Sequence, residues 1–490
     1  MSIYRPTPTD SFPTDTSVLQ GETEETLSKH IPSPEYPAQP LNRNAHLQWL
    51  VRNMVQGFPT RYTSQDASQP WLMFWTLQSL STLQAGLDSG NKQKAIDTIM
   101  SWQYPEGGFG GGPGQAPHLL ATYASVCALA NVGRPGPGGG WDEIDREKMY
   151  KFFLSVKQAD GSFTVMRHGE VDVRGIYCLL VVATLLDLLT PELVAGTPAF
   201  LASCQTYEGG FSSSSQPYFS SGTLLSSPRP PLGEAHGGYT FCALASWVLI
   251  KSFQPPPYGV DIDVKRLLRW LVMMQGSEIE LGGFKGRTNK LVDGCYSWWV
   301  GGAFALLEML GMPAARTEAP TAHSDTDDEW DDVDGQSYPL RPSVVQYSTV
   351  PDTLFNRKAL QEYVLYAGQH PTGGLRDKPP KTSDAYHTLG CLSGLASAQH
   401  HVTPSTRRRE EITLLWESNT ECAFTEQRKS AFIDALAWVE EEGASKYVGS
   451  SADRLNAMHP VFNLTMTHTD TMMGHFYQQT VPPRLMRRNV

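Results

Sequence analysis

The sequence Gln103-Tyr-Pro-Glu-Gly-Gly-Phe109 recurs, little changed, as Gln205-Thr-Tyr-Glu-Gly-Gly-Phe211. Related turns are Gln158-Ala-Asp-Gly-Ser-Phe163, Gly282-Gly-Phe284 and Gly373-Gly-Leu375. When irregular stretches are set aside, the copies recur about every fifty residues, a period typical of stacked supersecondary units. The chain is therefore predicted to be built from repeats, each of which buries little apolar surface alone.

Apolar segments with helical spacing lie between these turns, at residues 71–83, 122–130, 177–189, 241–250 and 298–310. No strand-like alternation of apolar and polar residues accompanies them. A helix, a Gly-Gly-aromatic turn and a second helix, repeated, predict helical hairpins that stack into a solenoid or close into a toroid. On the repeats alone, a non-catalytic helical scaffold fits as well as an enzyme.

Irregular stretches flank and interrupt the repeats. Residues 1–41 are rich in Pro, Ser and Thr without an apolar period, and we expect a disordered N-terminal tail there. Residues 42–490 are expected to form a single domain. We expect loop insertions in it at about 212–232, which is rich in Ser and Pro, and at about 316–342, which carries an acidic run.

Composition excludes some classes of function. The formal net charge of -11 argues against a general nucleic-acid binder, because contacts to phosphate need an excess of Lys and Arg. The seven cysteines form no CxxC pair, which is typical of reduced intracellular thiols. We expect a cytoplasmic protein without disulfides, signal peptide or transmembrane segment.

The densest chemical cluster precedes the segment at 298–310. Asp293 and Cys295 would lie about 200° apart on a regular helix, so they can converge only at a helix start. There Gly294 permits an irregular backbone, and the helix dipole favours a thiolate. A carboxylate beside a thiolate suits zinc, and His387, in Asp384-Ala-Tyr-His387, is the best third ligand. From these residues alone, a simple N-cap at Asp293 and a polar helix terminus at His387 are the commoner interpretations.

A set of ordered blocks resembles the β subunits of protein prenyltransferases. The blocks are Asp66-Ala-Ser-Gln-Pro-Trp71, Gly107-Gly-Phe-Gly-Gly-Gly-Pro-Gly-Gln-Ala-Pro-His118, Asp160-Gly-Ser-Phe163, Glu170-Val-Asp-Val-Arg174, Glu234-Ala-His-Gly-Gly-Tyr-Thr-Phe-Cys242, Lys290-Leu-Val-Asp-Gly-Cys-Tyr296 and Gly373-Gly-Leu-Arg-Asp-Lys-Pro379. A weaker match is His459-Pro-Val-Phe-Asn463. The resemblance implies an all-α protein, an α/α toroid with a central active-site cavity, in an obligate heterodimer with an α subunit.

The resemblance also implies the chemistry. It points to transfer of farnesyl from farnesyl diphosphate to the cysteine of CaaX-terminated proteins, with one zinc ion per chain and with magnesium for activity. Asp293, Cys295 and His387 match the zinc ligands and leave the fourth position for the substrate thiol. The diphosphate-binding positions match His236, Arg287, Lys290 and Tyr296. The catalytic residues implied are Asp293, Cys295, His387, Lys290 and Tyr296.

Further positions bear on specificity. The isoprenoid and peptide pocket matches Trp71, Trp75, His118, Glu170, Arg174, Tyr239, Trp299 and Tyr386. Asp377 matches a magnesium-binding carboxylate that type I geranylgeranyl enzymes replace by lysine, and Trp71 matches a bulky stop for farnesyl. Gly390, however, stands where the family carries a second bulky residue, a tyrosine, so the strictness of length selection is open. A geranylgeranyltransferase β subunit is therefore an alternative.

A less favoured alternative is a class II terpene cyclase. Asp325-Thr-Asp-Asp328 fits the DxDD signature of these enzymes, and Gly-Gly-Phe turns occur in their helical barrels. Inside an acidic run such a pattern arises easily by chance. A general acid with a raised pKa also needs a dry, structured pocket, which this segment is not expected to provide.

Overall fold

The computed structural model describes residues 6–32, 38–216, 219–220, 223–224, 229–254, 261–311, 354–417 and 422–479. The expected insertion at 316–342, with its DxDD pattern, lies outside these ranges. The expected insertion at 212–232 is described in part: β1 (Ser214–Ser215) pairs antiparallel with β4 (Pro231–Leu232). Within the same segment, β2 (Phe219–Ser220) pairs antiparallel with β3 (Thr223–Leu224).

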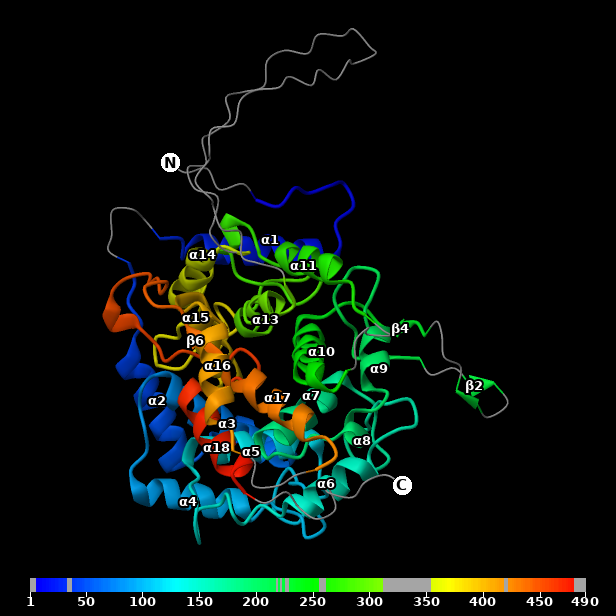
Figure 1. Ribbon diagram of the computed structural model, residues 1–490. Coiled ribbons are helices and arrows are strands. Elements are labelled where there is room, and N and C mark those ends of the chain that lie inside the picture. The colour runs from blue at the N-terminus through cyan, green and yellow to red at the C-terminus, as the bar shows by residue number, and fades with distance from the viewer. Residues whose placement is uncertain are drawn as a thin grey trace, which may run out of the picture.

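An inner ring of helices forms the centre of the molecule (Figure 1). In chain order its members are α3 (Gln69–Thr82), α5 (Leu119–Val132), α7 (Val173–Leu185), α10 (Gly237–Leu249), the pair α12 (Tyr296–Trp299) and α13 (Ala303–Met309), and α15 (Ala385–Gln399). Each packs against the next, and α15 packs against α3, so the ring is closed. The predicted all-α toroid is confirmed, and closure decides between the toroid and the solenoid.

An outer layer of helices surrounds this ring. Its members are α2 (Arg43–Gln56), α4 (Ser89–Met100), α6 (Arg146–Ser155), α8 (Pro191–Val194), α9 (Thr197–Ser203), α11 (Val264–Met273) and α14 (Arg357–Glu362). The outer helices are amphipathic: α11, for example, buries Leu267, Trp270 and Leu271, which lie on one face. Inner helices such as α5 are buried almost all round, because one side faces the outer layer and the other faces the centre.

The glycine turns join neighbouring hairpins. Gly107 has φ +109°, and a Cβ there would lie 2.2 Å from the carbonyl oxygen of Lys148 at the start of α6. Gly373, in the last turn, has φ +93°, and its Cβ would lie 2.3 Å from the carbonyl oxygen of Ala45 in α2. The contact that joins successive repeats therefore also joins the last hairpin to the first.

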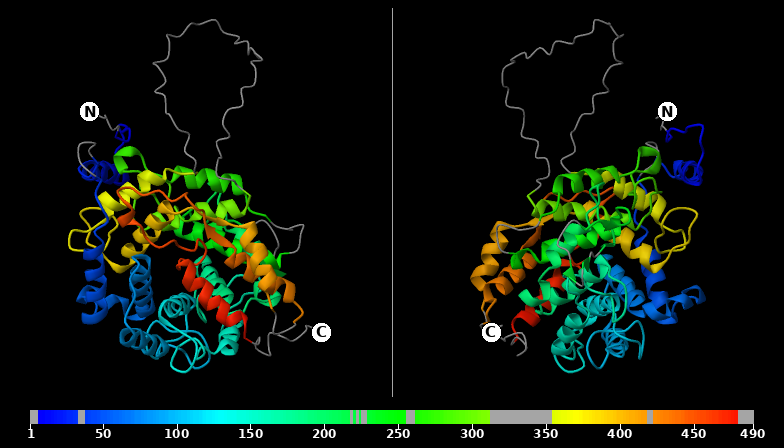
Figure 2. Two further views of the ribbon diagram at one scale, coloured as in Figure 1. Left: turned by 60° about the vertical axis from the view of Figure 1, so that its left-hand side comes forward. Right: turned by 90° about the vertical axis from the view of Figure 1, so that its right-hand side faces the viewer.

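The C-terminal part of the chain lies against the ring. It comprises β5 (Val402–Pro404), α16 (Thr406–Leu415), α17 (Thr425–Leu436), β6 (Trp438–Glu440), the 3₁₀ turn η5 (Ser451–Asp453) and α18 (Met466–Tyr477). β5 pairs antiparallel with β6, and α18 packs against α5 and α7 (Figure 2). Tyr123 and Tyr177, from α5 and α7, donate hydrogen bonds to the carbonyl oxygens of Phe462 and Val461. The segment before α18 thus lies against the inner helices.

Short helical turns complete the description: η1 (Thr60–Ser68), η2 (Lys251–Phe253), η3 (Glu278–Glu280) and the π-helical η4 (Tyr363–Gly368). All seven cysteines are unpaired. Among the residues described, no helix combines the length and the apolar character that crossing a membrane requires.

Part of the expected disordered tail is helical. Residues 15–28 form α1 (Asp15–Ser28), whose N-cap is Thr14. The Gln20 side chain donates to both Glu24 and Glu280, at 2.8 Å each, and so ties α1 to η3. The buried side of α1 consists of Thr23, Glu24 and Leu27. Two of these three residues are polar, so the sequence shows no apolar period there.

Candidate active site

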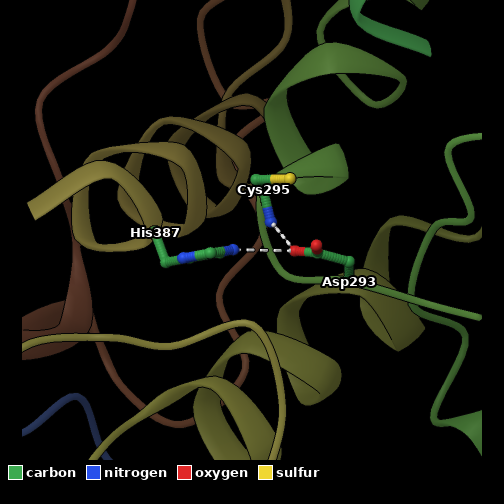
Figure 3. A group of neighbouring side chains, drawn as sticks. All are labelled: Asp293, Cys295 and His387. Carbon is green, nitrogen blue, oxygen red and sulfur yellow. Dashed lines mark hydrogen bonds and ion pairs between the residues drawn. The ribbon is translucent and has the colours of Figure 1, made fainter. Parts of the chain in front are cut away.

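Asp293, Cys295 and His387 come together at the starts of two inner helices. Their ligand atoms all lie within 4.8 Å of one another, and the His387 ring reaches from α15 towards Asp293 (Figure 3). His387 Nε2 is 3.2 Å from Asp293 Oδ1. Cys295 is buried, and the side chains of His387 and Asp293 are only 18 and 25 % exposed.

Local hydrogen bonds hold this cluster. Asp293 Oδ1 accepts the backbone N–H of Cys295 at 2.8 Å, so the two residues converge just before α12. Cys295 occupies the N-cap position of α12 but makes no capping bond with its side chain. The bond expected of a cap at Asp293, from its carboxylate to a backbone N–H two residues on, is present. Asp384 is the N-cap of α15: one carboxylate oxygen accepts the His387 backbone N–H, and the other lies 2.6 Å from His387 Nδ1. This pairing turns Nε2 towards Asp293 and Cys295.

The electrostatics of the cluster favour a cation. Burial raises the pKa of the Cys295 thiol, and the negative charge of Asp293 raises it further. α12 has only four residues, so the dipole expected to favour the thiolate comes from a short helix. Burial lowers the pKa of His387, but hydrogen bonds to Asp293 and Asp384 outweigh it and raise the pKa to about 12.

The donor set fits zinc. One thiolate, one imidazole nitrogen and one carboxylate oxygen are ordinary zinc ligands, at about 2.0–2.3 Å from the metal. Three such atoms within 4.8 Å need only a small inward movement to share one ion. His387 also has the carboxylate partner on its second nitrogen that metal-binding histidines commonly have.

His236 and Tyr296 meet beside this cluster. His236 is the N-cap of α10, and its Nδ1 accepts the backbone N–H of Gly238 at 3.0 Å. Its Nε2 lies 3.1 Å from the Tyr296 hydroxyl. Burial lowers the pKa of His236 to about 4, helped by the positive charge of Arg287. The imidazole is therefore a neutral donor near pH 7 rather than a cation.

Arg287 and Lys290 share one loop but differ in their partners. Arg287 Nη1 pairs with Glu234 Oε1 at 2.6 Å, and the two side chains are 39 and 49 % exposed. Lys290 is exposed and makes no ion pair with any residue in the described ranges. The structure therefore brings His236 and Tyr296 together, while these two cations lie in a more open loop.

Asp377 lies next to the Asp293–Cys295–His387 cluster. The backbone N–H of Gly294 donates to the carbonyl oxygen of Asp377 at 2.9 Å. The Asp377 carboxylate pairs with Lys378 Nζ at 2.5 Å. Burial raises the pKa of Asp377, and the negative charge of Asp293 adds to the rise. The Asp377 carboxylate, paired with Lys378, therefore also lies within the electrostatic influence of Asp293.

A cavity of about 500 Å³ opens beside these groups. Of the predicted pocket residues, its wall includes Trp71, Trp75, Arg174, Tyr239, Trp299 and Tyr386. Trp71 stacks on Trp75 with ring centroids 5.5 Å apart, and Trp299 Nε1 donates to the Tyr386 hydroxyl at 2.8 Å. The wall therefore combines a large aromatic surface with the polar groups of Arg174 and His236.

Two predicted pocket residues lie outside the wall of this cavity. His118 is the N-cap of α5, and the Glu170 carboxylate is near enough for its charge to raise the pKa of His118. Burial has the larger effect and lowers that pKa. Sequence reasoning missed Asp384 as the partner of His387, although the three-residue spacing is typical of an N-cap.

Gly390 lies in the cavity wall, but the space beside it is limited. A Cβ at this position would lie 3.0 Å from Cys295 Cα and 3.3 Å from its Cβ. Gly390 therefore lets α15 approach the backbone of the turn at Cys295 closely. The absence of the tyrosine that the family carries at this position therefore does not leave a cavity as large as a tyrosine side chain.

Comparisons with known proteins agree with this geometry. The prenyltransferase α/α toroid domain matches residues 41–464. The protein farnesyltransferase β subunit of Pisum sativum is 36% identical over 382 residues, which cover 72% of this chain and 84% of the pea protein. The corresponding subunit of Schizosaccharomyces pombe is also 36% identical, over 78% of this chain and 84% of its own length.

Similarity to geranylgeranyl transferases is weaker. The type-1 β subunit of Arabidopsis thaliana is 28% identical over 57% of this chain and 74% of its own length. The solved structure of Candida albicans protein geranylgeranyltransferase-I complexed with GGPP covers 89% of this chain and 99% of its own, with a TM-score of 0.57 at 16% identity. That likeness supports the shared fold. With the toroid domain across most of its length and 36% identity to these relatives, the chain belongs to the family of protein farnesyltransferase β subunits.

Proposed function

We propose that this chain transfers the farnesyl group of farnesyl diphosphate to the cysteine thiol of a C-terminal CaaX motif. The observation that carries the proposal is the cluster of Asp293, Cys295 and His387 beside an aromatic cavity. The two sites are continuous: Tyr386, in the cavity wall, lies 5.0 Å from the His387 ring between centroids. A thiol and an apolar chain can therefore be held side by side.

Asp293, Cys295 and His387 would hold zinc, one ion per chain. When bound there, zinc would supply the positive charge that lowers the pKa of the substrate thiol and maintains a thiolate at neutral pH. Asp384 fixes the ring of His387, and the backbone N–H of Cys295 fixes the carboxylate of Asp293. These contacts orient the donors before the substrate arrives.

The leaving diphosphate would be held by donors and cations from two helix starts and one loop. The Tyr296 hydroxyl and the neutral imidazole of His236 lie together and can both donate to phosphate oxygens. The Arg287 guanidinium would exchange Glu234 for the diphosphate, and Lys290 would add a second positive charge. Together they stabilise the negative charge that grows as the carbon–oxygen bond breaks.

Asp377 would hold magnesium beside the diphosphate. Magnesium, when bound, would neutralise part of the diphosphate charge. If so, Asp377→Lys should flatten the dependence of rate on magnesium concentration, because an ammonium replaces the ion. An unchanged dependence would leave Asp377 as a turn residue that pairs with Lys378.

The isoprenoid and the CaaX peptide would share the cavity and its rim. The aromatic wall around Trp71, Trp75 and Tyr386 excludes water and offers the apolar surface that both ligands need. His118, Glu170 and Arg174 would hold polar groups of the peptide. A farnesyltransferase α subunit as obligate partner and a cytoplasmic location belong to the same proposal.

Geranylgeranyl transfer is the second candidate, and Gly390 is the observation that favours it. The test is to co-express the chain with a farnesyltransferase α subunit and supply CaaX peptides with both isoprenoid diphosphates in competition. We expect the modified peptide to carry mostly farnesyl, as measured by mass spectrometry. Mostly geranylgeranyl product would replace the first candidate by the second, and no product with either lipid would refute both.

A further inference from the structure

One polar residue in the aromatic cavity is not explained by the proposed roles. Asn463 lies in the cavity wall and is only 6 % exposed. Its Oδ1 is buried and has no hydrogen-bond partner. Burying an amide oxygen without a partner is costly, so an unsatisfied group at a binding cavity calls for a reason.

The segment that carries Asn463 is firmly anchored. Tyr123 and Tyr177 donate to the carbonyl oxygens of the two preceding residues, at 3.2 and 2.8 Å. His459 accepts the Asn463 backbone N–H at 3.2 Å through its carbonyl oxygen, and its own N–H donates to Leu464 at 2.7 Å. The amide is thus presented to the cavity by a fixed backbone.

The segment that carries Asn463 is linked to the aromatic wall of the cavity. The Tyr123 hydroxyl bonds to the residue just before Asn463, and the Tyr123 ring packs against Trp71 with centroids 5.6 Å apart. His236, which would face the diphosphate, lies at the start of α10. Asn463 therefore lines the same cavity as Trp71, the residue expected to stop the isoprenoid, and Tyr123 links its segment to that tryptophan.

We propose that Asn463 is a specificity residue that disfavours isoprenoids longer than farnesyl. The inference rests on the proposed function. A farnesyl chain leaves room for water to bond to the amide oxygen, whereas one further isoprene unit would displace that water and offer no hydrogen bond in return. The longer lipid is then penalised by an unsatisfied polar group as well as by lack of space.

A purely structural role makes a different prediction. Asn463 has φ +55°, a left-handed conformation that asparagine adopts more readily than most residues. Asn463→Gly keeps this conformation accessible while it removes the amide. Asn463→Asp keeps the shape but places a carboxylate there, which is harder to strip of water. If Asn463 only stabilises the backbone conformation, both variants should keep the lipid preference of the wild type.

The experiment compares kcat/KM for farnesyl and geranylgeranyl diphosphate, with one CaaX peptide and the assembled heterodimer. We expect the ratio of farnesyl to geranylgeranyl use to fall about ten-fold or more in Asn463→Gly, and to rise in Asn463→Asp. Asn53→Ala is the matched control, because Asn53 is also buried with an unpartnered amide atom but does not line the cavity. Its ratio should equal that of the wild type.

The outcomes separate this inference from the proposed function. If the wild type does not farnesylate the peptide, the proposed function fails. If it does, and the ratio stays at the wild-type value in folded Asn463→Gly, the specificity role of Asn463 is refuted. If Asn463→Gly does not fold, Asn463→Asp decides: a ratio that does not rise refutes the role, and a rise supports it.

Discussion

The two polar parts of the candidate active site are held in different ways. The Asp293–Cys295–His387 cluster is largely buried and fixed by backbone hydrogen bonds and by Asp384. The loop with Arg287 and Lys290 is more exposed, and Arg287 is already paired with an acid. The chain thus organises the candidate metal ligands by itself, whereas Arg287 must leave Glu234 before it can bind a ligand.

This difference predicts different consequences of substitution. Groups that are fixed before binding contribute most where charge develops, because they need no rearrangement during the reaction. Exposed charges are screened by salt and contribute less. Substitutions in the Asp293–Cys295–His387 cluster should therefore cause the larger losses of activity. Substitutions in the loop with Arg287 and Lys290 should cause smaller losses that depend on salt.

The largest effect is expected for Cys295→Ala and His387→Ala. Each removes a metal ligand, so zinc content should fall and transfer should decrease about a thousand-fold or more. Farnesyl diphosphate binding should stay near wild type, because the donors to diphosphate are other residues. Cys204→Ala, at a buried cysteine outside the cluster, is the control. Zinc content equal to wild type in both variants, by atomic absorption, would exclude the proposed ligand set.

Asp384→Asn tests how far the Asp293–Cys295–His387 cluster depends on the contact between the Asp384 carboxylate and the His387 ring. The amide can still cap α15, but it cannot hold the His387 ring as a carboxylate does. We expect zinc affinity to fall about 10–100-fold, as is usual when such a partner of a metal ligand is lost. Competition with a chromophoric chelator measures this affinity. An unchanged affinity would show that the cluster does not need Asp384.

Arg287→Ala should weaken farnesyl diphosphate binding by about ten-fold, and the loss should shrink at high salt. Glu234→Gln is the informative partner variant, because it removes the acid that competes for Arg287. We expect it to strengthen binding slightly. If Glu234→Gln weakens binding as much as Arg287→Ala does, the ion pair itself, rather than the free guanidinium, supports the site.

The smallest effect is expected from pH. Because the pKa of His236 is lowered from 6.5 to about 4, its imidazole stays neutral from about pH 6 to 8. The ratio of farnesyl diphosphate affinities between wild type and His236→Asn should therefore be constant over that range. Comparing the two proteins cancels the titration of the ligand. A histidine cation would instead lose its advantage as pH rises past its ordinary pKa, and a falling ratio would reveal it.

Local patterns predicted much of this molecule. The apolar segments identified α3, α5, α7 and α10, and the segment at 298–310 is divided into α12 and α13. The convergence of Asp293 and Cys295 followed from helix geometry, since they could meet only before a helix. Such features depend on residues near one another in the chain.

Features that depend on distant contacts were not predictable. Helix α1 is held by Gln20 against Glu280, far away in the sequence, and so its composition alone suggested disorder. The limited space beside Gly390 depends on the Cys295 backbone, which no spacing rule reveals. Asn463 stood in a weakly matching block, and only folding brings it into the wall of one cavity with Trp71 and Tyr123.

The contact between Gly373 and Ala45 has a consequence for how the protein opens. In a linear array of repeats, the two terminal units have one neighbour each, and they fray first. Here the last glycine turn packs closely against the first outer helix, as each earlier turn packs against the outer helix that follows it. Every hairpin therefore has a neighbour on both sides. Amide hydrogen exchange should therefore be no faster in α3 and α15 than in α7, although the former lie near the two ends of the repeat series.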